Sequence, residues 1–294
     1  MPEAAQKPLP FGYQFLAGAI AGVSEILVMY PLDVVKTRAQ ISTGVSSSIM
    51  GTLKTMIKTE GPGSLYRGIL PPILVEAPKR ATKFAANEQY TAIYKKMFGF
   101  EKVTQSLSIM TGVSAGLTEA MLIAPFELVK VRMQDKANLG KYNGTADTIR
   151  KIVASEGALT LLNGLEATLW RQGVWNGVYF GLIFTVKDLL PKSKDSNQQR
   201  LTNFAAGTIG GMVATSFNTP FDVVKTRIQS YNGVGPKKYN WAVPGLVTVA
   251  KEEGIASLYR GFLPKVLRLG PGGGILLVVF ETVSGFIRKN VLKE

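Results

Sequence analysis

The chain has 294 residues, of which 34 are Lys or Arg and 20 are Asp or Glu, giving a formal net charge of +14. A surplus this large indicates anionic partners such as nucleic acid, lipid head groups or acidic small molecules. Cysteine and histidine are both absent, which excludes disulfides, thiolate chemistry, histidine zinc sites and His-based catalytic triads.

The N-terminal stretch MPEAAQKPLPFGYQF has no basic region ahead of an apolar run, and it is too short for an arginine-rich amphipathic presequence. A cleaved targeting segment is therefore not expected, and any organelle signal would have to be internal. The first long apolar stretch runs from Phe11 to Tyr30 and would suit a membrane span.

That stretch leads into the decapeptide PLDVVKTRAQ, Pro31 to Gln40, which combines a proline, an acid, two bases and a glutamine. Related decapeptides, PFELVKVRMQ and PFDVVKTRIQ, begin at Pro125 and Pro220, so the pattern recurs about every 95 residues. Each copy is followed by a second element: EGPGSLYRG, EGALTLLNG and EGIASLYRG. We therefore expect three repeats within one domain, residues 1–103, 104–198 and 199–294.

Each repeat offers two membrane spans, so we expect an all-α membrane protein with six transmembrane helices. The first spans end at the proline and carry Gly-x-x-x-Gly, which lets helix backbones approach closely. The second spans are mostly apolar, with charges on one face. Polar amphipathic stretches between them, such as 47–59 and 144–155, predict short helices along the membrane surface. The spans are Phe11 to Tyr30, Ser108 to Ala124 and Phe204 to Thr219, then Ile69 to Phe98, Ala167 to Leu190 and Leu263 to Ile287; the glycine pairs are Gly18 and Gly22, Gly112 and Gly116, and Gly207 and Gly211.

The distribution of basic residues predicts an orientation. The three long loops, counted from the decapeptide through the Arg-Gly-like element, hold 17 of the Lys and Arg residues, whereas the two shorter loops and both termini hold 11. By the positive-inside tendency, the long loops are expected to face the protein-synthesising or matrix side, with both termini opposite.

The three-copy pattern, with acid and base three residues apart after a proline, resembles the mitochondrial carrier family over essentially the whole chain. The resemblance implies a barrel of six helices with threefold pseudo-symmetry and short matrix-side surface helices. It also implies a central water-filled substrate site that opens alternately to the two sides of the inner mitochondrial membrane, in a monomer without cofactor or metal.

The acid and base of each decapeptide share a helix face beside the proline. A local pair at this spacing adds only about 0.2 to 0.5 kcal/mol, whereas charge inside a membrane usually marks function. By the resemblance, the charges pair between repeats and form a matrix-side gate, braced by Gln40, Gln134 and Gln229. The expected pairs are Asp33 with Lys130, Glu127 with Lys225, and Asp222 with Lys36.

The family's cytoplasmic-side gate is matched only in part. Of its acidic and basic positions, this chain keeps Glu88, Lys187 and Glu281, so Glu88 with Lys187 is the one ion pair expected there. We therefore expect a weaker gate on that side, and an altered exchange rate in a Glu88→Gln variant.

Cations within the second spans are candidates for substrate binding. Such Lys and Arg side chains can snorkel to lipid head groups, but three spans that each carry cations near their middle favour a ligand. An arginine fork suits a carboxylate, and separated cations suit a molecule with carboxylates at both ends. We infer a dianionic dicarboxylate. The candidate residues are Glu76, Lys79, Arg80 and Lys83 in the first repeat, Arg171, Gln172, Trp175 and Asn176 in the second, and Arg268 in the third.

Two further acids, Glu25 and Glu119, occupy equivalent intramembrane positions, where the third repeat has Ala214. They would either neutralise resident arginines in the empty cavity, the interpretation we favour, or carry a co-transported proton.

The phrases AGVSEILVMYPLDVVKTRAQ and EAPKRATKFAANEQY are similar to the 2-oxodicarboxylate branch of the family, especially its fungal form. That resemblance implies exchange of 2-oxoadipate and 2-oxoglutarate. It also implies cardiolipin near 66–68, 162–164 and 259–261, with a weaker middle site because Asn163 replaces a basic residue there.

Other functions remain as alternatives. A citrate or plain oxoglutarate carrier comes next, and a nucleotide carrier follows because Trp175 and Tyr179 could stack on a base. A nucleic-acid-binding protein would need a concentrated basic patch or motif, which is missing here. A membrane enzyme would need a nucleophile, metal or cofactor constellation; the glycine runs match neither a dinucleotide fingerprint nor a P-loop.

Overall fold

The computed structural model describes residues 9–42, 48–99, 102–190 and 196–292. These ranges contain long and short α-helices joined by brief turns, and they contain no β-strand, which confirms the all-α prediction. The helices are α1 (Phe11–Ile41), α2 (Ile49–Glu60), α3 (Leu70–Phe98), α4 (Gln105–Gln134), α5 (Thr145–Glu156), α6 (Leu165–Leu189), α7 (Ser196–Ser230), α8 (Ala242–Glu253) and α9 (Phe262–Ile287).

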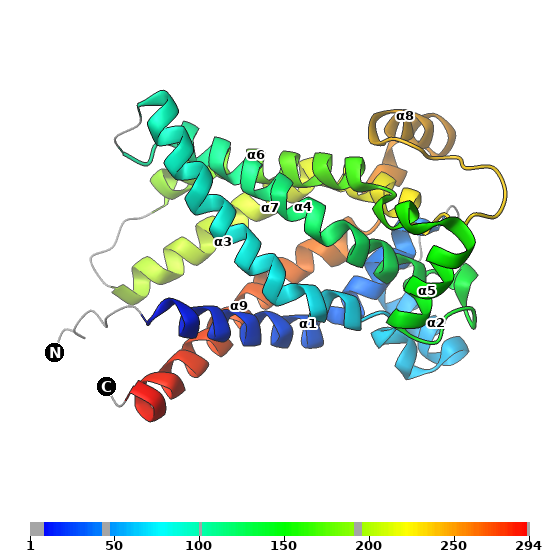
Figure 1. Cartoon of the computed structure of the whole chain (residues 1–294), viewed down its shortest axis with the longest axis horizontal. Helices are drawn as coiled ribbons and strands as arrows, with labels where there is room; N and C mark the ends of the chain where they lie inside the picture. Colours follow the sequence, from blue (N-terminus) through cyan, green and yellow to red (C-terminus); the bar gives the residue numbers. More distant parts are fainter. Residues whose placement is uncertain (1–8, 43–47, 100–101, 191–195, 293–294) are drawn as a thin grey trace.

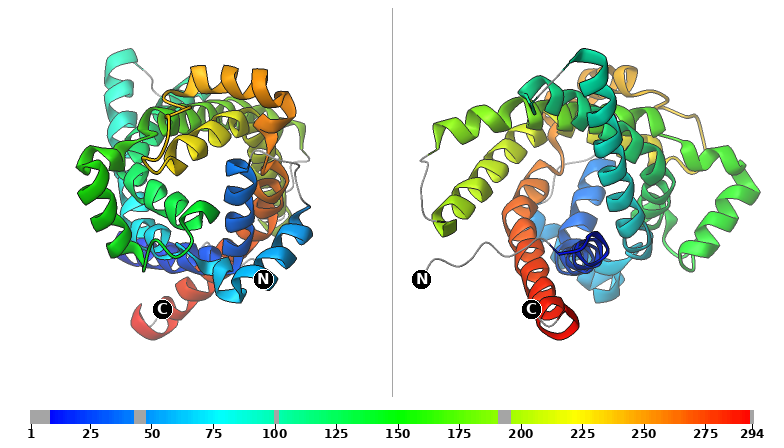
Figure 2. Two further views of the ribbon diagram at one scale, coloured as in Figure 1. Left: turned by 90° about the vertical axis from the view of Figure 1, so that its right-hand side faces the viewer. Right: turned by 60° about the vertical axis from the view of Figure 1, so that its left-hand side comes forward.

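The six long helices surround a common axis, and the three short helices lie at one end of the ring (Figures 1 and 2). Helix α3 packs on α4, α6 packs on α7, and α1 packs on α9, so the last long helix meets the first. The start of α1 and the end of α9 lie at the end opposite to α2, α5 and α8 (Figure 1). This arrangement is the barrel that the sequence predicts.

Helices α1, α4 and α7 each continue through the proline of the decapeptide, Pro31, Pro125 or Pro220. A proline inside a helix removes one backbone donor and clashes with the preceding turn, which bends the helix rather than ending it. The acid and base that follow therefore belong to the same helix as the apolar span, in its final turns.

The short helices end at glycines that the repeat places in register. Gly61, Gly157 and Gly254 have φ of 79°, 86° and 84°, a backbone conformation that strains any residue with a Cβ atom. Each follows directly on the last residue of its helix, a glutamate, so the Glu-Gly pair marks the end of α2, α5 and α8.

Three segments of the described chain are long and apolar enough to cross a membrane by composition: Gly12–Ile41, Gln105–Gln134 and Ile255–Leu292. Helices α3, α6 and α7 are not among these three segments. Their outer faces still expose large apolar residues, among them Leu74 and Phe84 on α3, Trp170 on α6 and Phe217 on α7. A helix in a ring needs an apolar face toward lipid only.

The glycine pairs make room for side chains rather than for helix backbones. A Cβ atom at Gly22 would lie 2.3 Å from Glu76 Oε1, and one at Gly116 would lie 2.3 Å from Asn176 Nδ2. A Cβ atom at Gly112 would lie 2.3 Å from the ring of Phe180. The sequence predicts that helix backbones meet at these glycines. The structure instead places side chains of another span against the glycine backbone.

Candidate functional site

Three ion pairs join neighbouring repeats where α1, α4 and α7 converge below their prolines. Lys36 Nζ lies 2.6 Å from Asp222 Oδ2, Lys130 Nζ lies 3.1 Å from Asp33 Oδ2, and Lys225 Nζ lies 3.0 Å from Glu127 Oε2. The structure therefore brings together the three pairs that the sequence and the family resemblance predict. We call these six residues the matrix-side ring.

Each acid of the matrix-side ring also meets a second cation, from α6 or α9. Arg268 Nη1 lies 2.6 Å from Asp33 Oδ1, and Arg171 Nη2 lies 3.1 Å from Glu127 Oε1. Lys265 Nζ lies 3.4 Å from Asp222 Oδ2. The sequence singled out the two arginines as substrate ligands, but it did not predict their contacts with the ring, and it missed Lys265.

The three glutamines differ in their contacts. Gln40 Nε2 donates to Asp222 Oδ2 at 3.0 Å, so it supports the pair with Lys36. Gln134 Nε2 donates instead to the hydroxyl of Tyr30, whose ring lies beneath Lys130. The side chain of Gln229 is buried and makes no hydrogen bond with the described part of the chain. A direct brace is thus present at one corner of the ring.

A cavity of about 190 Å³ lies against the matrix-side ring. Arg268 on α9 and Lys79 on α3 line it from different helices, and Glu25 and Glu76 contribute carboxylates. The lysines and two of the acids of the ring complete its charged lining. A small anion in this cavity would therefore contact both the candidate substrate-binding residues and the residues of the matrix-side ring.

The candidates on α3 form a charged row. Glu76 is only 2% exposed and is paired with Lys79 and with Arg80, whose Nε lies 2.7 Å from Glu76 Oε1. Lys83 Nζ lies 3.5 Å from Glu119 Oε2 on α4.

The candidates on α6 separate into two groups. Arg171 reaches the matrix-side ring, whereas Gln172 and Asn176 are buried, and Asn176 lies beside Gly116 of α4. Trp175 stacks on Tyr179 with ring centroids 4.9 Å apart. Gln172, Trp175 and Asn176 do not line the cavity described above.

The intramembrane acids are both paired with cations. Glu25 Oε1 lies 2.8 Å from Arg268 Nη2 and accepts from Nε at 3.0 Å. Glu119 pairs with Lys83, so its partner is a lysine rather than the arginine that the sequence suggested. These contacts fit neutralisation of resident cations.

Comparison with known proteins assigns the chain to a family. The model of the mitochondrial carrier protein family matches three consecutive segments, residues 7–98, 101–194 and 196–291. The chain belongs to the mitochondrial carrier family. It is therefore a transporter rather than an enzyme, and its place is the mitochondrial inner membrane.

Several relatives cover this carrier almost from end to end. The mitochondrial citrate transporter D of Aspergillus niger is 59% identical over 96% of each chain. A probable mitochondrial 2-oxodicarboxylate carrier of Schizosaccharomyces pombe is 53% identical over 96% of each chain. The mitochondrial 2-oxodicarboxylate carrier of Mus musculus is 42% identical over 94% of this chain and 95% of the relative.

This carrier has a second ring of charge that the sequence analysis missed. Arg38, Arg132 and Arg227 each donate two hydrogen bonds to the glutamate at the end of the short helix in the same repeat, Glu60, Glu156 or Glu253. Each arginine also donates through Nε to a backbone carbonyl of the next repeat, that of Gln134, Gln229 or Gln40. The sequence features that could have predicted this second ring are the second base of every decapeptide and the glutamate of every Glu-Gly pair.

The pKa of the Glu60 and Glu253 carboxyls lies below the usual range because Arg38 and Arg227 donate hydrogen bonds to them. A carboxyl whose pKa is depressed by folding contributes stability above its unfolded pKa and loses it as the pH falls through the folded value. The Glu60 and Glu253 pairs of this second ring therefore contribute fully at neutral pH and weaken only in acid.

The cytoplasmic-side gate is described only in part. Glu88 on α3 and Glu281 on α9 are exposed. The side chain of Lys187 lies outside the described residues, so its pairing with Glu88 stays a prediction.

Proposed function

We propose that this carrier exchanges 2-oxodicarboxylates, namely 2-oxoadipate and 2-oxoglutarate, by alternating access across the inner membrane, with its three repeats acting as one unit. The observation that carries the proposal is the position of Arg268, which binds Asp33 of the matrix-side ring and Glu25 at the wall of the cavity. Relatives named as 2-oxodicarboxylate carriers in distant organisms support the substrate class.

A substrate carboxylate would compete with these two acids for the arginine. The guanidinium presents a planar fork that matches a carboxylate with two hydrogen bonds. A diacid that takes Arg268 leaves Asp33 with Lys130 as its cross-repeat partner. The second carboxylate would meet Lys79 on α3, across the same cavity. Substrate binding then weakens this corner of the matrix-side ring, because it removes Arg268, one of the two cations that contact Asp33.

The energies fit reversible gating. The three ion pairs of the matrix-side ring are largely buried, so separating one with no replacement partner costs more than the roughly 1 kcal/mol of an exposed pair. The second cation at each acid lowers that cost. Reversing a population from 1:99 to 99:1 takes about 5.5 kcal/mol. Two charge-assisted hydrogen bonds to the substrate contribute about 1.5 to 3 kcal/mol each. They supply most of this free energy when they become strongest during the transition between states.

The lipid and oligomeric proposals rest on the matrix end of the ring. A groove of about 510 Å³ lies between the start of α2 and the Tyr259 to Gly261 element, with Arg260 in its wall. The N-terminus of a helix attracts phosphate, so we place a cardiolipin head group here. The six helices close their own ring, which supports a carrier that works as a monomer.

Citrate is the second candidate substrate, because the Aspergillus niger relative is named as a citrate transporter. Citrate carries a third carboxylate, and α3 carries two further cations beyond the cavity lining, Arg80 and Lys83, that could receive it.

Purified carrier in liposomes preloaded with 2-oxoglutarate tests the proposal. External 2-oxoadipate and 2-oxoglutarate are expected to be exchanged faster than citrate, malate, phosphate or ADP. Preferential uptake of citrate would replace the substrate assignment with the second candidate, and uptake of ADP without uptake of oxoacids would overturn the dicarboxylate proposal.

The bare backbone at Gly22 gives a test of how the α3 cations are positioned. A Gly22→Ala variant would place a methyl group 2.3 Å from Glu76 Oε1 and 2.7 Å from Arg80 Nη2. We expect exchange to fall about tenfold, because misplacing charged ligands by about 1 Å is costly. Gly18→Ala is the matched control, since its nearest neighbour, Arg80 Nη1, lies 4.0 Å away. Equal rates in the two variants, measured as initial uptake, would contradict this role.

A further inference from the structure

We propose that Lys265 is the resident counter-ion of Asp222, which keeps this carboxylate paired after Lys36 leaves it and thereby makes the matrix-side gate easier to open. The inference rests on the proposed alternating access, but it does not depend on which anion is carried. It concerns a residue for which neither the family motif nor the substrate argument supplies a role.

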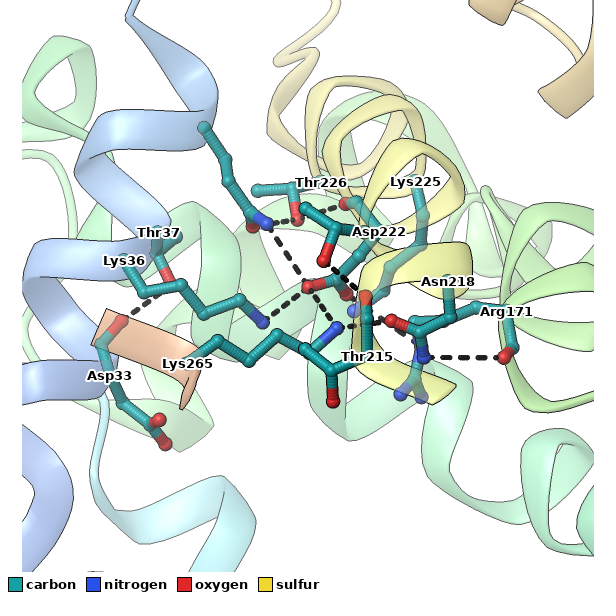
Figure 3. Close-up of polar contacts among 12 residues, drawn as sticks. Asp33, Lys36, Thr37, Arg171, Thr215, Asn218, Asp222, Lys225, Thr226 and Lys265 are labelled. Carbon is teal, nitrogen blue, oxygen red and sulfur yellow. Dashed lines mark hydrogen bonds and ion pairs between the residues drawn. The ribbon is translucent and has the colours of Figure 1, made fainter. Parts of the chain in front are cut away.

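Figure 3 shows the corner of the ring around Asp222, which has more polar partners than the corners of Asp33 and Glu127. Asp222 is only 1% exposed, and its Oδ2 atom lies 2.6 Å from Lys36 Nζ and 3.4 Å from Lys265 Nζ. Gln40 Nε2 donates to the same oxygen at 3.0 Å, and Arg171 Nε lies 3.8 Å from the other oxygen. Two lysines therefore share one carboxylate oxygen.

The two lysines belong to different repeats. Lys36 is on α1 of the first repeat, whereas Lys265 is on α9 and Asp222 on α7, both in the third. Lys265 Nζ also donates to Asn218 Oδ1, which lies one turn before Asp222 on α7 (Figure 3). Helix α9 also packs on α1, but the contacts of Lys265 itself are with Asn218 and Asp222 of α7. When the matrix ends of α1 and α7 part, Lys36 therefore leaves with α1, while Lys265 keeps its contacts with α7.

A buried carboxylate that loses a cation pays a desolvation penalty unless another cation stays beside it. Lys265 lowers that penalty in the open state of this corner, because it contacts the oxygen that Lys36 leaves, whereas Arg171 lies 3.8 Å from the other oxygen. In the closed state, Lys265 weakens the ion pair between Lys36 and Asp222, because both lysines contact Oδ2 and their like charges repel each other. Both effects favour opening.

The role differs from that of Arg268 at the Asp33 corner. Arg268 lines the cavity beside the ring and is available to a substrate, whereas Lys265 does not line that cavity. Its side chain is 17% exposed and points between Asn218 and Asp222 (Figure 3). Its loss should therefore change the balance of states rather than the fit of the substrate.

The chain contains no cysteine, so a single reporter thiol can follow the gate. Gln229 is 0% exposed, lies one turn beyond Lys225 and makes no hydrogen bond with the described residues, while its Cγ packs against Gly164 of the preceding repeat. A Gln229→Cys background should react with a water-soluble maleimide only when the matrix side opens. All variants are compared in that background, in liposomes, with the reagent on both sides.

We expect Lys265→Gln to slow labelling about fivefold, the effect of about 1 kcal/mol on the open population. Lys36→Gln should speed labelling, so two neighbours of one carboxylate should act in opposite directions. Lys265→Arg, which keeps the charge, should label at the rate of the background. Combined with Asp222→Asn, the Lys265→Gln change should have no further effect.

Faster or unchanged labelling in Lys265→Gln would overturn the proposal, as would an effect that persists in the Asp222→Asn background. Poor folding of Lys265→Gln would show in gel filtration, and the comparison of Lys265→Arg with Lys265→Met then decides in the same way. A background that is never labelled would instead contradict alternating access. Failure of oxoacid exchange with normal labelling would remove the substrate assignment and leave the role of Lys265 intact.

Discussion

An Arg268→Ala variant is expected to lose 2-oxoglutarate exchange by at least about 100-fold, because two charge-assisted hydrogen bonds at about 1.5 kcal/mol or more each disappear. The same change also removes the second cation from Asp33 and the partner of Glu25. Substrate binding would then have nothing to take from the gate, so the loss should appear in the maximal rate as well as in affinity.

Two further variants make that result specific. Arg268→Lys keeps the charge but not the planar fork, so we expect an intermediate loss of about tenfold. Arg150→Ala removes an exposed arginine from α5, far from the ring, and should exchange at the normal rate. Initial rates in liposomes decide between these outcomes. Normal exchange by Arg268→Ala would remove the residue on which the proposed function depends.

Replacing Arg132 by methionine is expected to destabilise the carrier by about 3 to 5 kcal/mol, the usual cost of breaking a buried ion pair. Arg132 is 0% exposed, and it donates to both oxygens of Glu156 at 2.8 and 2.9 Å and to the carbonyl of Gln229 at 2.9 Å. Methionine fills a similar space but leaves these acceptors without a donor. The carrier in detergent should unfold at a temperature lower by about 10 °C.

A nearby ion pair provides the control for that prediction. Lys151 and Asp147 form a pair 2.8 Å apart on the exposed face of α5, and exposed pairs contribute less than about 1 kcal/mol. Lys151→Gln should therefore unfold close to the unchanged carrier. If Arg132→Met were as stable as Lys151→Gln, the second ring would have no structural importance.

The repeat pattern explains why much of the fold could be predicted from sequence. Three equivalent helices that meet at one axis place equivalent residues together, and the resemblance to the carrier family implied which lysine pairs with Asp33, Glu127 and Asp222. The same logic applied to Arg38, Arg132 and Arg227, but the matching glutamates lie in a separate element, and the sequence analysis did not join the two patterns.

The rest depended on helix rotation, which a single sequence does not specify. Gln172 and Asn176 occupy a row next to Arg171, and a turn of a few tens of degrees decides whether that row faces the cavity or α4. Lys265 lies three residues before Arg268, and nothing in its local sequence indicates that it reaches Asp222 on α7. The glycine spacing predicts contacts between helix backbones, because a periodic pattern within one helix does not indicate which side chains of another helix pack against it.

The most direct test of the central claim is the distance between the matrix ends of α1 and α4, measured with spin labels at Ser42 and Lys136. Both positions are exposed, lie just beyond the ring formed by Asp33 and Lys130, and can be labelled uniquely in a chain without cysteine. If a diacid binds Arg268 and thereby helps the matrix-side ring to open, saturating 2-oxoglutarate should add a population with a longer distance between the labels. Phosphate should not. An unchanged distance distribution with 2-oxoglutarate and 2-oxoadipate would contradict the account.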